Sequence, residues 1–172
     1  MNTKNIYLVG FMGAGKSHVG CRLARVLHLE HIDLDYLLEK ECMLSAKDIF
    51  KKYGENRFRS LERNILLSTP SQGVISTGGG AILSQANREF LSDKLVIWLN
   101  PDWNNLYNRI KNSKRPLVLR NSKDTLYQIY KDRIALYREV TNIEINQSDM
   151  DDVIDEILKK IIDLTGSSNE LR

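Results

Sequence analysis

Short apolar runs alternate along the chain with longer segments in which apolar residues recur every three or four positions. The short runs are typical of buried parallel strands, and the longer spacing is typical of amphipathic helices. Their alternation predicts an α/β fold, in which a parallel sheet carries helices on both faces. We expect strands at Ile6–Val9, His31–Leu34, Val74–Ser76, Leu95–Leu99 and Ile143–Ile145.

The segments between these strands predict helices. The first helix opens at Lys16 and continues to about His28. The second begins at Ser45, because Ser45 and Asp48 have the spacing of a capping box with Asp in place of the usual Glu. Another helix follows Gly54, and further helices are expected over about 84–91, 101–111, 125–139 and 150–164.

Two segments lie outside this alternation. Residues 112–123 are polar and basic with little periodicity, which predicts a mobile surface loop. Residues 165–172 predict a flexible tail at the end of the chain. The length of 172 residues fits one domain with a sizeable core, and we assign residues 1–172 to a single domain.

Composition narrows the class of protein. Hydrophobic residues make up 42% of the chain and charged residues 27%, which is ordinary for a soluble globular protein. The net charge of +3 is too small to indicate a nucleic-acid partner. Cys21, expected in the core, and Cys42 lack the spacing of a zinc site. The sequence shows no signal peptide and no membrane span, so we expect a cytoplasmic protein without a membrane partner.

The strongest motif occupies residues 10–17, which read Gly-Phe-Met-Gly-Ala-Gly-Lys-Ser directly after the first predicted strand. This is the phosphate-binding pattern G-x-x-x-x-G-K-S/T in its expected context between a strand and a helix. Glycine lets backbone N–H groups approach phosphate oxygens, and the helix directs the positive end of its dipole at the same anion. A glycine-rich turn with a chance Lys-Ser pair is the alternative. Nucleotide contacts are expected from Gly13, Ala14, Gly15, Lys16, Ser17 and His18.

Two further strand ends carry unusual residues, and ligands of open α/β sheets collect at the carboxyl ends of strands. Asp33 and Asp35 are two apart, so on an extended segment their side chains share a side. One carboxylate would face Mg²⁺ and the other an alcohol, although Asp35 also fits a helix N-cap and Asp33 a surface acid. The run 78–80, three glycines, favours a ligand against bare backbone, with a loose loop as the alternative.

Arginine side chains complete the candidate site. The guanidinium forks of Arg59 and Arg133 suit a carboxylate substrate, and Glu62 is close enough in sequence to pair with Arg59. Arg115, in the basic loop, suits a lid that closes over a triphosphate and stabilises developing charge. Each of these arginines also fits an ordinary surface group. A solvated linker remains open for Lys114, Arg120 and Lys123.

In their order and spacing, these motifs resemble the shikimate kinase family over about residues 4–164. The matching segments are the loop at 10–17, Asp33-Leu34-Asp35, Phe58-Arg59-Ser60-Leu61-Glu62, Ser76-Thr77-Gly78-Gly79-Gly80, Arg115-Pro116-Leu117 and Arg133 followed by Tyr137. The resemblance implies a three-layer α/β/α P-loop kinase with a five-stranded parallel sheet of order 2-3-1-4-5. It also implies substrate-binding helices at about 34–62, a lid at about 112–123, and ATP-dependent phosphorylation of the 3-hydroxyl of shikimate on the pathway to chorismate and aromatic amino acids.

The resemblance also implies roles for individual residues. Lys16, Asp35 and Arg115 would be catalytic, and Ser17 with Asp33, the latter through water, would hold one Mg²⁺ ion. ATP would also contact Arg115 and Arg109. The Arg109 side chain would stack on adenine. Glu62 would anchor Arg59 from behind. Shikimate would be held by Asp35, Arg59, Gly78, Gly79, Gly80 and Arg133.

Two departures from the family pattern affect the nucleotide side. His18 stands where the family usually has Thr, and residues 146–149 lack a basic residue that some relatives place near adenine. A kinase of another hydroxy acid, such as gluconate, and a nucleotide-binding regulatory module without catalysis are the competing interpretations. Only the full motif set favours shikimate over another hydroxy acid, and the joint retention of Lys16, Ser17, Asp33, Asp35 and Arg115 argues against a module without catalysis. The small size and the lack of an apolar surface stripe predict a monomer.

Overall fold

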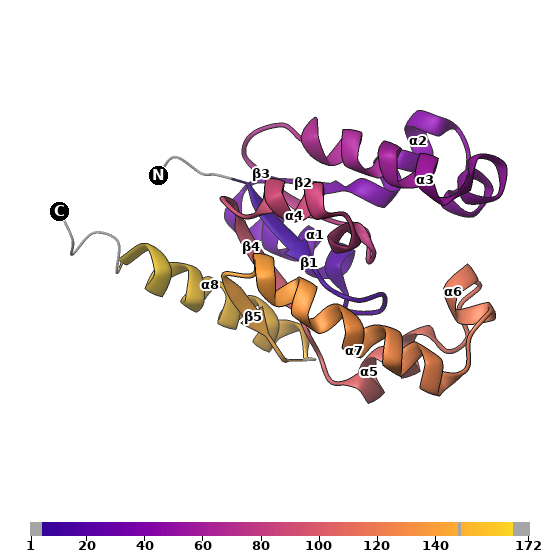
Figure 1. Cartoon of the computed structure of the whole chain (residues 1–172). Helices are drawn as coiled ribbons and strands as arrows, with labels where there is room; N and C mark the ends of the chain where they lie inside the picture. Colours follow the sequence, from indigo (N-terminus) through magenta and orange to yellow (C-terminus); the bar gives the residue numbers. More distant parts are fainter. Residues whose placement is uncertain (1–4, 148, 167–172) are drawn as a thin grey trace.

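A parallel sheet forms the centre of the computed structural model, which describes residues 5–147 and 149–166 (Figure 1). Within those residues the sheet has five strands in the order β2-β3-β1-β4-β5, and all neighbouring strands are parallel. The strands are β1 (Ile6–Val9), β2 (Glu30–Asp33), β3 (Gly73–Ser76), β4 (Leu95–Leu99) and β5 (Ile143–Ile145). The predicted fold class and strand order are confirmed.

Helices connect the strands and cover both faces of the sheet (Figure 1). They are α1 (Lys16–Leu27), α2 (Leu34–Cys42), α3 (Ala46–Leu67), the 3₁₀ helix η1 (Ala81–Leu83), α4 (Gln85–Leu91), α5 (Trp103–Ile110), α6 (Pro116–Leu119), α7 (Lys123–Val140) and α8 (Met150–Gly166). Side chains of α1, α5 and α8 join one buried cluster, and side chains of α2, α3 and α4 join the other, whereas α7 contributes Tyr130 to the first cluster and Tyr137 and Val140 to the second. The sheet lies between these two layers.

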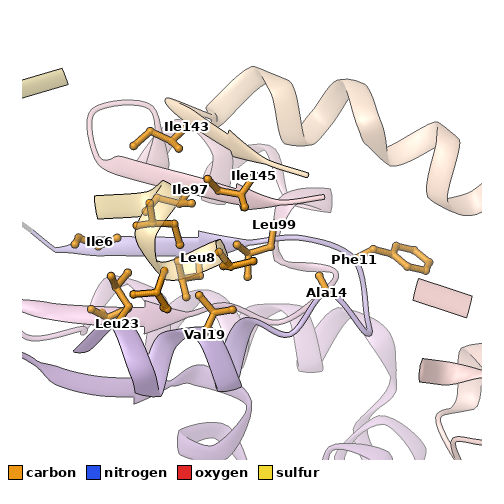
Figure 2. Close-up of a cluster of buried hydrophobic side chains, with 14 of the residues drawn as sticks. Ile6, Leu8, Phe11, Ala14, Val19, Leu23, Ile97, Leu99, Ile143 and Ile145 are labelled. Carbon is orange, nitrogen blue, oxygen red and sulfur yellow. The ribbon is translucent and has the colours of Figure 1, made fainter. Parts of the chain in front are cut away.

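The strand β1 shows why its apolar run is continuous. Ile6 and Leu8 belong to the cluster with α1 and α8, which Figure 2 shows, whereas Tyr7 and Val9 belong to the opposite cluster. Successive side chains of a strand point to opposite faces, so a strand covered on both sides needs an apolar residue at every position. The phosphate-binding motif therefore follows a strand that is anchored on both faces.

The chain between β2 and β3 differs in part from the expectation. Ser45 caps α3 by accepting a hydrogen bond from the Asp48 backbone N–H at 3.1 Å, as predicted. Gly54 adopts φ 76° and ψ 173° and kinks α3 into two halves, which agrees with a second helix after this residue. The extended path expected through Asp33 and Asp35 is wrong, because β2 ends at Asp33 and α2 begins at Leu34.

The structure also corrects three smaller expectations. The segment 112–123 contains the short helix α6, so it is more ordered than its low periodicity indicated. Cys21 lies in α1 but is exposed, and its assignment to the core is wrong. The last helix continues to Gly166 rather than Leu164, and the rest of the expected tail, 167–172, lies outside the described residues. Each helix in the described part of the chain is too short or too polar to cross a membrane.

Candidate active site

The phosphate-binding loop joins β1 to α1 in a conformation that requires glycine. Gly13 and Gly15 have φ values of 82° and 92°, which belong to the left-handed region. A Cβ atom at Gly13 would also stand 2.7 Å from the Ile110 side chain and 3.1 Å from the Leu106 carbonyl oxygen. Gly15 is the N-cap of α1, so the first N–H groups of this helix face the loop. The arrangement is that of an anion site at a helix N-terminus.

Lys16 folds back over this loop. Its Nζ donates hydrogen bonds to the carbonyl oxygens of Gly10, at 2.8 Å, and Phe11, at 3.3 Å. Burial lowers the pKa of Lys16 to about 8; the carboxylate of Asp35 opposes this shift, whereas the Arg115 cation adds to it. The charges of the three residues predicted to be catalytic, Lys16, Asp35 and Arg115, therefore influence one another.

Asp33 links the end of β2 to the phosphate-binding loop. Its Oδ1 accepts hydrogen bonds from the backbone N–H groups of Asp35, at 3.0 Å, and Tyr36, at 3.2 Å, so Asp33 is the N-cap of α2. Its Oδ2 accepts a hydrogen bond from the Ser17 hydroxyl. The role of N-cap considered for Asp35 thus falls to Asp33. A hydroxyl and a carboxylate oxygen, ligands that Mg²⁺ accepts, stand together at the N-terminus of α1.

Asp35 lies in the first turn of α2 and keeps contact with solvent. The protein around its carboxyl group partly desolvates it and raises its pKa, and the neighbouring carboxylates of Asp33 and Glu39 raise it further, whereas Lys16 and Arg115 oppose the shift. A carboxylate in such surroundings is a stronger base than one in water. This side chain fits the acceptance of a proton from an alcohol.

Each member of the triple glycine is packed against a different part of the site. A Cβ atom at Gly78 would collide with Glu62 Oε1 and would lie 2.9 Å from Asp35 Oδ1. At Gly79 it would lie 3.2 Å from the Met12 backbone nitrogen, and at Gly80 it would lie 2.9 Å from the guanidinium nitrogens Nη1 and Nη2 of Arg59. The alternative of a loose loop is therefore excluded, because side chains and the phosphate-binding loop pack directly on this backbone.

Arg59 projects from α3 toward this glycine run. Its Nη1 donates to Glu62 Oε2 at 2.9 Å, and its Nη2 lies 3.6 Å from Glu55 Oε1. Glu62 is only 3% exposed; burial raises its pKa, and the paired Arg59 opposes that shift. The expected anchoring of Arg59 by Glu62 is therefore present. The ion pair holds the guanidinium in one orientation.

Arg133 approaches the same glycine run from α7. Its Nη1 donates to the Gly79 carbonyl oxygen at 3.2 Å, and its guanidinium carbon lies 5.4 Å from the centre of the Phe11 ring. Burial lowers the pKa of Arg133, and the positive charge of Arg59 contributes to the shift. Two partly buried cations thus share one small region, which suits an anionic ligand that interacts with both.

The remaining predicted residues surround the phosphate-binding loop. Arg115 is the N-cap residue of α6, and its backbone carbonyl oxygen accepts hydrogen bonds from the N–H groups of Val118 and Leu119, both at 3.0 Å. Arg109, on α5, donates to the Gly13 carbonyl oxygen at 3.2 Å, and His18 is exposed on α1. In Figure 1, α6 extends beyond the sheet on the same side as α2 and α3, and a cavity of about 390 Å³ separates it from the kink of α3.

Sequence reasoning missed the supporting role of two aromatic residues. Tyr137 donates its hydroxyl proton to the Gly79 carbonyl oxygen at 3.0 Å and stacks on Trp98 with ring centres 5.3 Å apart. Phe11, a variable position of the phosphate-binding motif, lies under Arg133. The spacing of Arg133 and Tyr137 on one helix face was a signal for the first contact. No local pattern indicates the second.

Comparisons with known proteins agree on one family. The model of the shikimate kinase family matches residues 12–163. A shikimate kinase of Macrococcus caseolyticus is 40% identical over 164 residues, covering 93% of this chain and 98% of that protein. The structure of shikimate kinase from Acinetobacter baumannii in complex with shikimate has a TM-score of 0.86 at 38% identity, covering 98% of this chain and 96% of that chain. A gluconokinase from Sinorhizobium meliloti 1021, with a TM-score of 0.58 at 15% identity, shares the fold alone.

Proposed function

The chain belongs to the shikimate kinase family, and on this basis we propose where and how its reaction takes place. It phosphorylates the 3-hydroxyl of shikimate with ATP, on the pathway to chorismate and aromatic amino acids. We assign the transfer to the edge of the sheet where the phosphate-binding loop, the start of α2 and the run 78–80 meet. The single observation that carries this assignment is that side chains from α2, α3 and α7 converge on those three glycines.

On the nucleotide side, residues 13–18 bind the phosphates of ATP. Lys16 releases the carbonyl oxygens of Gly10 and Phe11 and bridges the β- and γ-phosphates. Arg109, beside the loop, contacts adenine. The Ser17 hydroxyl and, through water, Asp33 would hold one Mg²⁺ ion, which supplies charge neutralisation on the phosphate oxygens. The contact between these two side chains supports their assignment.

On the acceptor side, Arg59 and Arg133 bind the carboxylate of shikimate, because both cations face the same glycine run. Asp35 binds the ring hydroxyls. The glycines of the run 78–80 contact the ring through their backbone, and the carbonyl oxygen of Gly79 is held by Arg133 and Tyr137. Glu62 keeps Arg59 in place from the other side.

The chemistry is an in-line transfer of the γ-phosphoryl group. Asp35 orients the 3-hydroxyl and accepts its proton, and the raised pKa of this carboxyl favours that role. Lys16 and Arg115 offset the negative charge that spreads over the transferred group. Most of the rate enhancement comes from positioning and from this charge neutralisation, since the protein forms no covalent bond with either substrate.

We also propose the arrangement in which the enzyme works. Residues 1–172 form one functional domain, the helices within 34–62 bind shikimate, and residues 112–123 are a lid that carries Arg115 over the nucleotide. The cavity between α3 and α6 leaves room for that closure. The protein acts as a monomer in the cytoplasm, where ATP is available.

A coupled ADP-release assay over a panel of hydroxy acids tests this function. Shikimate should give rapid ADP release, and gluconate should give little. Faster turnover of gluconate would assign a different substrate, and no release with any acceptor would indicate a regulatory module. The variant Arg133→Lys keeps the charge but loses the fork, so it should weaken shikimate binding more than ATP binding. Equal shikimate affinity for both proteins, measured by calorimetry, would remove Arg133 from the site.

A further inference from the structure

A chain of hydrogen bonds beneath the phosphate-binding loop has no part in the mechanism above. Ser76, at the end of β3, donates its hydroxyl proton to the backbone carbonyl oxygen of Lys16 at 2.9 Å. The same hydroxyl lies 3.0 Å from Nε2 of His31 on β2. A hydroxyl has one proton, so Ser76 accepts the second bond and His31 donates it from Nε2. Three elements, β2, β3 and α1, are thereby connected at one carbonyl group.

Gly20 on α1 stands directly against this chain of bonds. A Cβ atom there would lie 2.6 Å from His31 Nε2 and 2.6 Å from Ser76 Oγ. Glycine inside a helix is less favourable than alanine, so its presence needs a packing reason. The close approach of His31 and Ser76 is that reason, and it is independent of the hydrogen-bond geometry. Ser76 is 1% exposed, so its contacts are protected from water.

The accepting carbonyl lies at a sensitive point of the loop. The Lys16 carbonyl and the Ser17 N–H belong to the same rigid peptide plane and point in opposite directions. A hydrogen bond that fixes the Lys16 oxygen from below therefore directs the Ser17 N–H toward the side where phosphate binds. It also fixes the backbone that carries the Ser17 hydroxyl.

We propose that His31 and Ser76, with Gly20 providing the space, are positioning residues that orient the Lys16–Ser17 peptide toward the phosphates of Mg–ATP. This inference rests on the proposed nucleotide site. None of the three residues touches a substrate. Their loss should therefore weaken nucleotide binding and turnover while leaving shikimate binding unchanged.

A set of substitutions tests the proposal. His31→Leu removes the donor, whereas His31→Gln carries an N–H group to about the same place as Nε2. Ser76→Ala removes the bond to Lys16, and Gly20→Ala pushes the partners apart. Ser92→Ala is the matched control, because Ser92 donates to the carbonyl oxygen of Glu89 at 2.7 Å far along the chain from this loop.

Calorimetry with Mg and a non-hydrolysable ATP analogue measures nucleotide affinity without turnover. We expect a loss of about tenfold for His31→Leu, Ser76→Ala and Gly20→Ala, the size of one lost hydrogen bond. His31→Gln should recover most of the affinity, and Ser92→Ala should show no change. The Kd for shikimate should stay constant throughout. Unchanged nucleotide affinity, an equal loss for both ligands, or no recovery by His31→Gln would overturn the proposal.

A double substitution separates this chain of bonds from general stability. Because His31 acts through Ser76, the pair His31→Leu with Ser76→Ala should be no weaker for the nucleotide than Ser76→Ala alone. A double variant whose loss of nucleotide affinity equals the product of the two single losses would contradict the proposal. Thermal melting identifies any variant that does not fold. The comparison of His31→Leu with His31→Gln then decides whether an N–H donor at position 31 is needed for nucleotide affinity. The function itself is tested separately, because wild-type ADP release with shikimate does not depend on these variants.

Discussion

At the scale of single residues, Asp35 combines functional value with a cost to folding. The folded protein raises its pKa, chiefly by partial desolvation, although Lys16 and Arg115 favour the charged form. A carboxyl with a raised folded pKa is most favourable to folding below its unfolded pKa, and this contribution is lost as pH rises through the folded pKa. Because Asp35 keeps contact with solvent, which screens its charge, the charged carboxylate lowers the free energy of unfolding at neutral pH only slightly. A neutral side chain of the same shape removes that penalty.

The substitution Asp35→Asn should separate activity from stability. Turnover should fall by about 10²–10⁴-fold, because the acceptor of the hydroxyl proton is lost. The free energy of unfolding at neutral pH should stay equal or rise, as measured by denaturant titration, and ATP should still bind. The control Asp155→Asn alters an exposed carboxylate of α8 and should change neither property. Normal turnover of Asp35→Asn would refute the role of this residue.

The pKa of Lys16 predicts that kcat/KM for ATP depends on pH. Its pKa is about 8, lowered by burial, so its positive charge is lost as pH rises through that value. Since kcat/KM reports groups of the free enzyme, kcat/KM for ATP should fall above about pH 8. Bound phosphate stabilises the charged form, so kcat should persist to higher pH. Initial rates across pH check this, and a flat kcat/KM for ATP well above pH 8 would contradict it.

At the scale of elements, most of the architecture could be predicted from the sequence, because strands buried on both faces leave a continuous apolar run. The helix α2 was less evident. Asp33 as N-cap, followed by Leu34, Leu37 and Leu38 at helical spacing, was a usable signal. The spacing of Asp33 and Asp35 also fits an extended segment, so this motif alone does not show that the chain turns into a helix at Leu34.

The helix α6 also had a usable signal in the sequence, because Pro116 at the first helical position is a recognised helix start within a basic, aperiodic stretch. Other features had no local signal. The contacts of Gly78 with Glu62, and of Gly79 with Tyr137, join residues far apart in the chain. Spacing identified the side chains of the candidate site, but only the fold shows which backbone each of them supports.

The kink of α3 gives a prediction at this scale. Gly54 has φ 76° and ψ 173°, a conformation almost restricted to glycine. It allows Phe50, before the kink, to pack on Phe58 with ring centres 5.2 Å apart. Gly54→Ala should lower the free energy of unfolding by about 1–3 kcal/mol, although no atom lies within 4 Å of the added Cβ.

The control for this substitution is Gly166→Ala at the end of α8, where a Cβ would also meet no atom within 4 Å. Gly166 does not have the positive φ of Gly54, so backbone strain is the difference between the two sites. Urea denaturation of both variants measures it. Equal stability of the two variants would show that the kink carries no conformational requirement for glycine.

At the scale of the whole molecule, the sheet edge formed by β5 bears on the oligomeric state. Exposed edge strands offer backbone groups to other chains, and proteins protect them by short length and by lysine. The strand β5 spans only Ile143–Ile145, and Lys160 of α8 donates to the Glu144 carbonyl oxygen at 2.7 Å. Large exposed apolar side chains, such as Val26 of α1, Met43 after α2 and Ile162 of α8, belong to different elements. Among the residues that the structure describes, neither the β5 edge nor these side chains therefore favour pairing with a second copy.

Light scattering coupled to size exclusion should therefore give the mass of one chain, 19.8 kDa, independent of protein concentration. The variant Lys160→Ala exposes the Glu144 carbonyl oxygen, so it should self-associate more readily than the wild type. The control is Lys159→Ala, which alters the exposed neighbouring lysine and should behave like the wild type. A wild-type mass that rises toward twice this value with concentration would show that a surface outside β5 pairs two copies. A monomer would also leave the proposed closure of residues 112–123 over the nucleotide unobstructed.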